Sequence, residues 1–186
     1  MELNKFFVIT GPSGVGKTSI AYRILDVNLP VLKVITTTTR AQRPSEQDGV
    51  DYNFITKESF LQKIENDEMF EWASYDDLYY GSQNKDVKSV IKQNKTPMWV
   101  VDVQGAQYFK DNFPNCVVIF IAPESLSALH DRLQSRGDDP ADIKKRVALA
   151  EKEMKSSFAF DYQVINFDNQ LDQAVEEVAQ IIEQEL

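Results

Sequence analysis

An eight-residue glycine-rich segment constrains this chain more than any other feature. Residues 11–18 read Gly-Pro-Ser-Gly-Val-Gly-Lys-Thr and match the pattern G-x-x-x-x-G-K-[ST]. The apolar run Lys5–Thr10 before it predicts a buried strand, and Lys17–Leu25 after it predicts a helix. Backbone N–H groups of such a loop surround phosphate oxygens, and the dipole of the helix favours their negative charge. The segment therefore predicts a nucleoside triphosphate site on an α/β fold, and by itself leaves kinases, GTPases and other ATPases open.

The residues of this loop have distinct expected roles. Lys17 would bring a formal charge near the β- and γ-phosphates, and the Thr18 hydroxyl would ligate Mg²⁺, the cofactor that accompanies ATP. A glycine-rich turn with an incidental lysine is the alternative, but it does not account for the strand and helix on either side. The loop residues expected to bind ATP are Gly11, Pro12, Ser13, Gly14, Val15, Gly16, Lys17 and Thr18.

Strand-like and helix-like segments alternate along the rest of the chain. Apolar runs predict strands, and apolar residues at helical spacing predict helices. The expected strands are Leu32–Thr37, Pro97–Val103, Cys116–Ile121 and Tyr162–Asn166, and the expected helices are Asn84–Asn94 and Leu171–Ile182. This alternation is typical of a parallel sheet with helices on its faces, a three-layer fold of the P-loop NTPase type.

Two segments interrupt the alternation. Residues 38–82 are polar, aromatic and turn-rich, with one helix-like piece at Ser59–Asn66. Residues 132–146 are dense in charge and contain Gly137 and Pro140. Both are predicted to be insertions in a single domain, and insertions of this kind often carry function.

The composition restricts the partners and the compartment. The chain has 186 residues, which suits one domain, and a formal net charge of -9 argues against binding nucleic acid. Its one cysteine, Cys116, lies in an apolar run and cannot form an internal disulfide. The N-terminus has no cleavable signal pattern, and no apolar stretch is long enough to cross a bilayer. We therefore expect a cytoplasmic protein without a membrane partner.

Two arginines three positions apart follow the strand expected at Leu32–Thr37. Two guanidinium groups and a phenol would hold a phosphate if Arg40, Arg43 and Tyr52 converge; solvated loop arginines are the alternative. Further along, Glu71 is suited to read guanine, because a carboxylate accepts two hydrogens side by side and guanine offers that pair on N1 and N2. A surface carboxylate is the alternative for Glu71.

Together these motifs resemble the guanylate kinase family over nearly the whole chain. Besides the phosphate loop, they are T-T-R-x-x-R-x-x-E-x-x-G-x-D-Y-x-F at Thr38–Phe54, E-W-A at Glu71–Ala73, Y-Y-G-S at Tyr79–Ser82 and D-x-Q-G at Asp102–Gly105. The resemblance implies transfer of the γ-phosphoryl group of ATP to GMP, with dGMP as a second candidate acceptor. It also implies a core at 1–35, 84–125 and 157–186, a GMP-binding insertion at 36–83 and a helical lid at about 126–156.

The same resemblance implies roles for individual side chains. The GMP phosphate would be held by Arg40, Arg43, Tyr52 and Tyr80, and the guanine side would be faced by Thr36, Glu71 and Asp102, with Ser82 nearby. Arg132, Arg136 and Arg146 match lid arginines that would join Lys17 and Arg40 in catalysis, and Asn166 matches a position near adenine. A solvated helix face with weak ion pairs is the alternative for Arg132 and Arg136.

The chain also departs from the family pattern. Thr36 replaces a serine, Ser45 replaces a glycine and is expected to stiffen its turn, and Val100 replaces an acidic residue. Because strand side chains alternate, positions 100 and 102 are expected on one face, so a carboxylate is missing beside Asp102. We therefore expect weakened handling of Mg²⁺.

Three alternative functions are each compatible with part of the sequence. A sugar-phosphate kinase would not need the arginine pair, Tyr52 or Glu71. A non-catalytic interaction module of guanylate kinase type would lose the phosphate loop, which is intact here. A diverged relative that binds GMP but turns over slowly is supported by Val100. The sequence predicts no oligomeric state.

Overall fold

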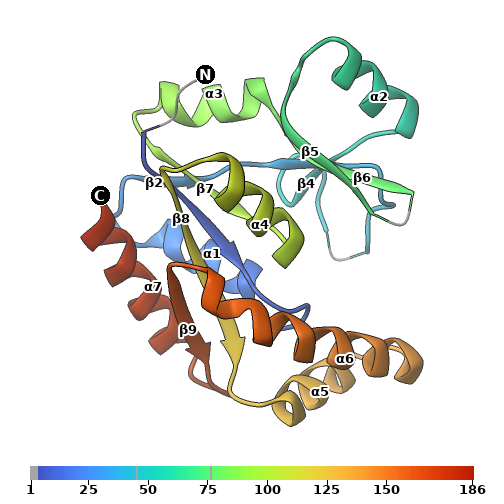
Figure 1. Cartoon of the computed structure of the whole chain (residues 1–186), viewed down its shortest axis with the longest axis vertical. Helices are drawn as coiled ribbons and strands as arrows, with labels where there is room; N and C mark the ends of the chain where they lie inside the picture. The colour runs from blue at the N-terminus through green and yellow to red at the C-terminus, as the bar shows by residue number, and fades with distance from the viewer. Residues whose placement is uncertain (1–3, 45, 76) are drawn as a thin grey trace. The chain divides into compact units, whose positions relative to one another are not determined.

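The computed structural model describes residues 4–44, 46–75 and 77–186, and the chain divides into two compact units (Figure 1). The phosphate-loop unit comprises residues 1–29 and 100–186, and the inserted unit comprises residues 30–99. Ser45, whose replacement of glycine was expected to stiffen a turn, lies outside the described residues.

Three parallel strands form the centre of the phosphate-loop unit. β1 (Phe6–Thr10) pairs with β8 (Cys116–Pro123), and β8 pairs with β9 (Tyr162–Asn166). Every residue of β1 and β8 is buried, which accounts for their continuous apolar sequence, since parallel strands are covered on both faces. These strands confirm the α/β fold class with a parallel sheet.

Helices pack on these strands. α4 (Val103–Asn112) contacts β1 and β8, whereas α7 (Leu171–Glu185) contacts β9 and α1 (Lys17–Asp26). The apolar residues of α7 recur at helical spacing, as the sequence predicted, and most of them are buried: Ala174, Val175, Val178, Ile181 and Ile182. On the other side of the strands, the ring of Phe109 in α4 lies edge-on to Phe6, with 5.8 Å between the ring centres.

The strand expected at Pro97–Val103 is wrong at its C-terminal end. β7 (Thr96–Val100) ends at Val100, and Val103 is the first residue of α4. Asp102 is the N-cap of that helix, where its carboxylate accepts a 2.8 Å hydrogen bond from the Gly105 N–H. Positions 100 and 102 therefore do not belong to one strand, and the alternation argument that placed them on the same face fails.

The charge-rich segment forms two helices. α5 (Leu126–Ser135) and α6 (Pro140–Ser156) are joined by a turn in which Gly137 has φ +78°, and a 3₁₀ turn at Ser157–Ala159 follows α6. The two helices share an apolar cluster of buried side chains, namely Leu129, Leu133, Ile143 and Ala150. Their charged residues lie on the remaining faces, which explains the high charge density of the sequence.

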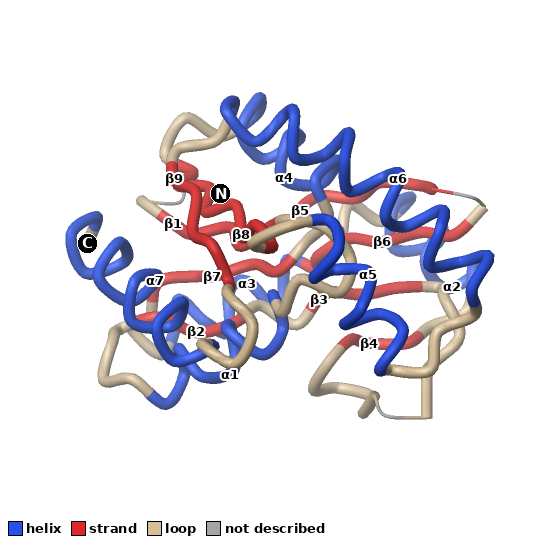
Figure 2. The backbone as a smooth tube through the Cα atoms, turned by 90° about the horizontal axis from the view of Figure 1, so that it is seen from below, coloured by secondary structure: helices blue, strands red, loops and turns tan. Residues whose placement is uncertain are grey.

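The inserted unit contains a mixed four-stranded sheet in the order β4-β3-β6-β5 (Figure 2). β3 (Thr36–Thr38) is parallel to β4 (Tyr52–Phe54) and antiparallel to β6 (Leu78–Gln83), which is antiparallel to β5 (Met69–Tyr75). Two helices belong to this unit: α2 (Lys57–Glu65), which contacts β6, and α3 (Asn84–Lys92), which contacts β5 and β6.

The single strand expected at Leu32–Thr37 is two strands. β2 (Val31–Lys33) pairs in parallel with β7, whereas β3 begins at Thr36 and belongs to the four-stranded sheet. The Val34 N–H still bonds to the carbonyl oxygen of Met98, and the chain then leaves β7. The β-branched sequence continues through the switch, so no local signal marks it.

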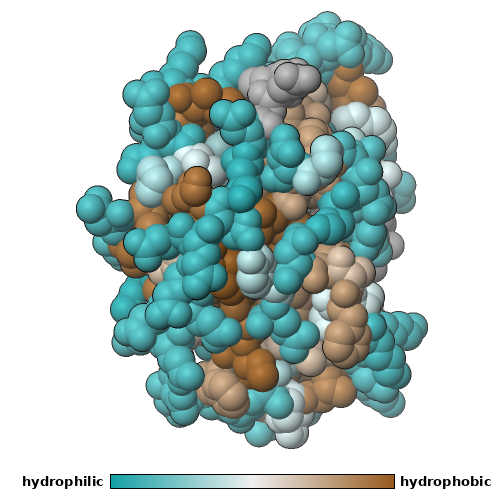
Figure 3. Space-filling view, turned by 60° about the vertical axis from the view of Figure 1, so that its left-hand side comes forward, coloured by the Kyte–Doolittle hydropathy of each residue, from teal (hydrophilic) through white to brown (hydrophobic). Residues whose placement is uncertain are grey.

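Polar side chains cover most of the face shown in Figure 3, with hydrophobic residues visible between them.

Cys116 is a buried free thiol, and burial raises its pKa to about 12, which confirms its interpretation as a small buried hydrophobe. Within the described residues, none of the helices combines the length and apolarity needed to cross a membrane.

Candidate active site

Two glycines of the phosphate loop are required by their surroundings. Gly11 has φ +136°, and a Cβ there would lie 2.1 Å from the carbonyl oxygen of Ile121. Gly16 has φ +103°, and its Cβ would lie 2.6 Å from the Nδ2 atom of Asn166. A side chain at either position would be strained and would also collide with β8 or with Asn166. Val15 between them is fully buried, whereas Ser13 and Thr18 are exposed.

The ammonium group of Lys17 lies inside this loop. Its Nζ atom donates to the carbonyl oxygens of Gly11 at 2.6 Å and Pro12 at 2.9 Å. Desolvation by burial lowers the pKa of Lys17 to about 8, although the negative charges of Glu153 and Asp102 oppose that shift. Phosphate oxygens entering the loop would compete with the two carbonyl oxygens for the Lys17 hydrogens.

Glu153 is an acidic group near the loop that the sequence did not indicate. It belongs to α6, and burial raises its pKa, while the charge of Lys17 acts in the opposite direction and that of Asp102 reinforces it. Its Oε2 atom is buried without a hydrogen-bond partner among the described residues. Glu153 occurs among other charged residues of a helix, so only its burial and its charge interaction with Lys17 distinguish it from a solvated carboxylate.

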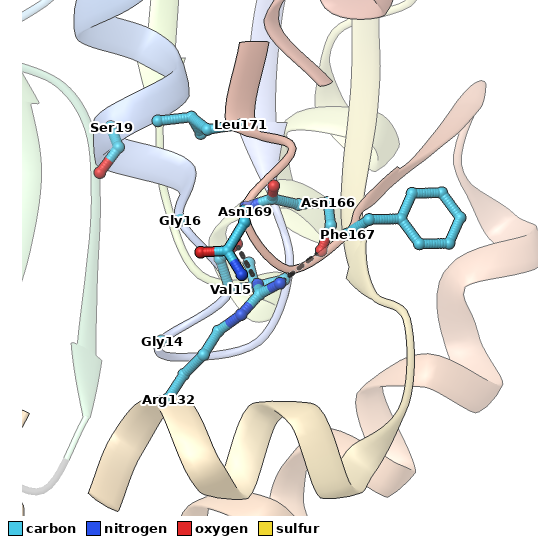
Figure 4. A pocket seen from close by; sticks show the side chains of 9 residues that line it. All are labelled: Gly14, Val15, Gly16, Ser19, Arg132, Asn166, Phe167, Asn169 and Leu171. Carbon is cyan, nitrogen blue, oxygen red and sulfur yellow. Dashed lines mark hydrogen bonds between the residues drawn. The ribbon is translucent and has the colours of Figure 1, made fainter. Parts of the chain in front are cut away.

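A pocket beside the loop contains Asn166 and Arg132 (Figure 4). Asn166 ends β9, is buried, and donates from Nδ2 to the carbonyl oxygen of Val15 at 2.8 Å. Arg132 projects from α5, donates to the Asn166 carbonyl oxygen at 2.7 Å and forms an ion pair with Asp168. In this structure Arg132 therefore connects α5 to the residues around the end of β9.

The other two expected lid arginines lie elsewhere on the helical pair. Arg136 is the exposed C-terminal cap of α5. Arg146, in α6, forms an ion pair with Asp138 at 3.1 Å. The structure thus brings Arg132 next to the phosphate loop, holds Arg146 on the turn between α5 and α6, and leaves Arg136 at the surface.

In the inserted unit, Glu46 organises the arginine pair. Arg40 Nη2 donates to Glu46 Oε1 at 2.7 Å, and the Arg43 backbone N–H donates to Glu46 Oε2 at 2.9 Å. Burial alone would raise the pKa of Glu46, but these two hydrogen bonds and the arginine charges lower it below its ordinary value. Glu46 stands in the sequence motif, but its two partners are apparent only from the fold.

Aromatic rings lie against the Arg40 guanidinium. Its Cζ atom is 5.5 Å from the ring centre of Tyr52 and 5.7 Å from that of Phe54. Burial raises the pKa of Tyr52, in spite of the Arg40 charge, so its hydroxyl keeps a proton to donate. Tyr80 is half-buried in β6 and pairs with Thr38 of β3, while Arg43 is mostly exposed.

Glu71 and Ser82 face each other across β5 and β6. They are register partners, and the Ser82 hydroxyl donates to Glu71 Oε1 at 2.7 Å. The indole N–H of Trp99 in turn donates to Ser82 Oγ at 2.8 Å. Thr36 is 7% exposed in β3. Asp102 is an exposed residue of the phosphate-loop unit, whereas the other expected GMP ligands belong to the inserted unit.

Comparison with known proteins shows to which family this chain belongs. The guanylate kinase family model matches residues 3–185. The guanylate kinase of Synechocystis sp. is 40% identical over 97% of this chain and 94% of its own length, and that of Thermotoga maritima is 41% identical over 97% and 87%. A crystal structure of guanylate kinase from Anaplasma phagocytophilum superimposes with a TM-score of 0.77 at 27% identity, covering 98% of this chain and 86% of that one. The chain belongs to the guanylate kinase family.

Proposed function

We propose that this protein transfers the γ-phosphoryl group of ATP to GMP, giving ADP and GDP. The observation that carries the proposal is the Lys17 ammonium held inside an intact phosphate loop in a chain of this family. A loop of this form binds the phosphates of a nucleoside triphosphate. The relatives named guanylate kinase, at about 40% identity over most of the chain, support GMP as the acceptor.

The acceptor phosphate would bind at the Arg40 and Arg43 pair. The Glu46 carboxylate fixes Arg40 by a direct ion pair, so the guanidinium is oriented before a ligand arrives. The protonated Tyr52 hydroxyl supplies a further donor beside it. We assign the same function to Tyr80, and the base contacts to Glu71, Ser82, Thr36 and Asp102.

The reaction is an in-line displacement. An oxygen of the GMP phosphate attacks the γ-phosphorus, the bond to the bridging oxygen of ADP breaks, and no covalent enzyme intermediate forms. Positioning and charge neutralisation carry the catalysis, through Lys17, Arg40 and the helical-pair arginines Arg132, Arg136 and Arg146. The γ-phosphoryl group must be kept from water, which is the role we give to the segments at 36–83 and about 126–156.

The residues around the loop fit Mg²⁺ as the cofactor. Mg²⁺ prefers oxygen ligands and is commonly bound through one or two carboxylates together with substrate phosphates. The exposed Thr18 hydroxyl and the carboxylates of Asp102 and Glu153, which both act on Lys17, supply such oxygens. When bound with ATP, Mg²⁺ would neutralise charge on the β- and γ-phosphates.

We place this activity in the cytoplasm, with ATP and GMP as the small-molecule partners and dGMP as a second candidate acceptor. The strongly negative net charge opposes binding to nucleic acid phosphates.

A coupled assay of ADP release tests the proposal directly. GMP, dGMP, AMP, CMP and UMP are offered in turn at saturating ATP and Mg²⁺, and GMP should give the highest kcat/KM. Lys17→Met is the matched inactive control and should abolish turnover while its circular dichroism melt stays close to that of the wild type. Equal turnover with AMP, or near-normal activity in the variant, would contradict the proposal. GMP binding without turnover would instead indicate a non-catalytic module or a slow relative.

A further inference from the structure

A buried chain of hydrogen bonds leads from Trp99 to Glu71 within the inserted unit. Trp99 Nε1 donates to Ser82 Oγ at 2.8 Å, and Ser82 Oγ donates to Glu71 Oε1 at 2.7 Å. Trp99 and Ser82 have no exposed surface, whereas Glu71 is half-buried. The chain of hydrogen bonds therefore runs from the interior of the unit outward to the Glu71 carboxylate.

The donor inventory of these groups determines the direction of both bonds. An indole N–H donates only, so Ser82 Oγ must accept from Trp99. A carboxylate accepts only, so the single hydroxyl hydrogen of Ser82 must point to Glu71. Trp99 thus removes the rotational freedom that a serine hydroxyl ordinarily has.

Backbone pairing fixes Glu71 and Ser82, and ring stacking fixes Trp99. Glu71 and Ser82 are opposite one another in the β5–β6 ladder, next to a register irregularity between Met69 and Glu71. Gly81 allows this approach, because a Cβ there would lie 2.4 Å from the Glu71 carbonyl oxygen. The ring of Phe70 stacks on Trp99 with 5.7 Å between ring centres and 23° between planes, which holds the indole in place.

We propose that Trp99 is a positioning residue for base specificity: through Ser82 it fixes the Glu71 carboxylate in the orientation that accepts the N1 and N2 hydrogens of guanine. The inference rests on the proposed function, in which Glu71 reads the base. A carboxylate oxygen has more than one acceptor site, so the Ser82 bond leaves Glu71 able to accept from a ligand. Two parallel hydrogen bonds to a base require a fixed carboxylate plane. The hydrogen bonds from Trp99 to Ser82 and from Ser82 to Glu71 hold the Glu71 carboxylate in such a plane.

The test compares Trp99→Phe with the wild type on GMP and on inosine monophosphate. Inosine monophosphate keeps the N1 hydrogen of guanine but lacks the 2-amino group. The ratio of kcat/KM for GMP to kcat/KM for inosine monophosphate therefore measures how well Glu71 is oriented. We expect Trp99→Phe to raise the KM for GMP and to lower this ratio, each by roughly five- to tenfold, as for the loss of one ordinary hydrogen bond. The KM for ATP and kcat should change by less than about twofold, because the hydrogen bonds between Trp99, Ser82 and Glu71 serve the base and not the triphosphate.

Two control variants separate this role from packing and from the proposed function. Phe70→Leu removes the ring that stacks on the indole but leaves the Trp99 N–H able to donate to Ser82, and it should lower the ratio much less than Trp99→Phe does. Equal loss in both variants, or an unchanged ratio in Trp99→Phe, would overturn the inference. Glu71→Gln is measured in parallel. If it loses GMP activity while Trp99→Phe does not, only the role of Trp99 fails; if it keeps full GMP activity, the assignment of Glu71 fails as well.

A spectroscopic measurement covers the case in which Trp99→Phe does not fold. The chain has two tryptophans, so Trp72→Phe assigns the indole N–H resonance of Trp99 in the ¹⁵N-labelled protein. Saturating GMP should shift that resonance more than saturating inosine monophosphate, and Ser82→Ala should shift it in the free protein. A resonance that is insensitive to GMP and to Ser82→Ala would overturn the proposal.

Discussion

The side-chain amide of Asn166 donates a 2.8 Å hydrogen bond to the backbone carbonyl oxygen of Val15. The last residue of β9 is therefore fastened to the middle of the phosphate loop, although 151 positions separate the two residues. The same amide stands 2.6 Å from where a Cβ of Gly16 would lie, so it also restricts the residue that can occupy position 16.

Replacing Asn166 by alanine should weaken both the loop and its affinity for ATP. The buried Val15 carbonyl oxygen would lose its 2.8 Å bond and keep only the 3.5 Å bond from Arg132 Nη1, which should cost about 1 kcal/mol of unfolding free energy. We expect a higher KM for ATP and an unchanged KM for GMP. Urea denaturation and steady-state kinetics measure the two effects. Asn112→Ala, which removes an exposed amide bond to the Tyr108 carbonyl oxygen, is the matched control and should leave both KM values as they are.

Asp102 should show two separable roles. Asp102→Ala removes the N-cap of α4 and should cost about 1 kcal/mol of stability. Asp102→Asn keeps a side-chain acceptor for the Gly105 N–H but removes the negative charge that opposes the pKa depression of Lys17. We expect near-wild-type stability but reduced turnover in the asparagine variant. Thr56→Ala, which removes the cap of α2, is the control: it should lose similar stability without a kinetic change. If Asp102→Asn is as unstable as Asp102→Ala, the separation is wrong.

Glu71→Gln should cause a collapse of kcat/KM for GMP. The amide replaces one acceptor oxygen with a donor that opposes a guanine hydrogen, and sites that lose such a match can forfeit a factor on the order of 10⁴. The KM for ATP should change little. Glu65→Gln, on an exposed position at the end of α2, provides the neutral comparison. Unaltered GMP kinetics in Glu71→Gln would mean that the base is read by other residues.

The ion pair of Glu46 should make stability depend on pH in acid. Its folded-state pKa is lowered, so its stabilising contribution is complete above the ordinary value of 4.5 and is lost as the pH falls through the lowered folded-state value. The difference in unfolding free energy between the wild type and Glu46→Gln should therefore shrink as the pH falls from about 6 to about 3. Denaturant titrations at several pH values measure it, and a difference that stays constant would show that the Glu46 charge is not responsible.

Val100 should raise the Mg²⁺ requirement. The resemblance to guanylate kinases implies an acidic residue at position 100, the last residue of β7, and valine removes that carboxylate. One carboxylate oxygen of Asp102 also accepts the Gly105 N–H, so fewer oxygens remain for Mg²⁺ and its waters. We expect the wild type to need more Mg²⁺ than formation of the ATP complex alone demands, and Val100→Asp to need less. A Mg²⁺ titration at fixed ATP and GMP compares the two proteins. If both saturate together and at equal turnover, valine at this position is a neutral substitution.

Local sequence determined much of the fold. β1, β8 and β9 are apolar runs of strand type, and α1, α3 and α7 were expected from apolar spacing or from the phosphate-loop pattern, so periodicity and burial agree. The phosphate loop is also a local feature, because its conformation depends on glycines at set positions. The resemblance to guanylate kinases predicted which side chains bind ATP and GMP, and those roles stay predictions that the variants above test.

Tertiary structure decided what periodicity could not. The apolar run through Val103 looked like one strand, but β7 ends at Val100 and the Asp102 carboxylate starts α4 by capping it. The run from Leu32 to Thr37 likewise divides between two sheets, because strand pairing depends on partners far along the chain. Glu46, Trp99 and Glu153 were missed for the same reason. Each is an ordinary residue in its own segment, and its significance comes from hydrogen bonds, burial or charges that only the folded chain brings to it.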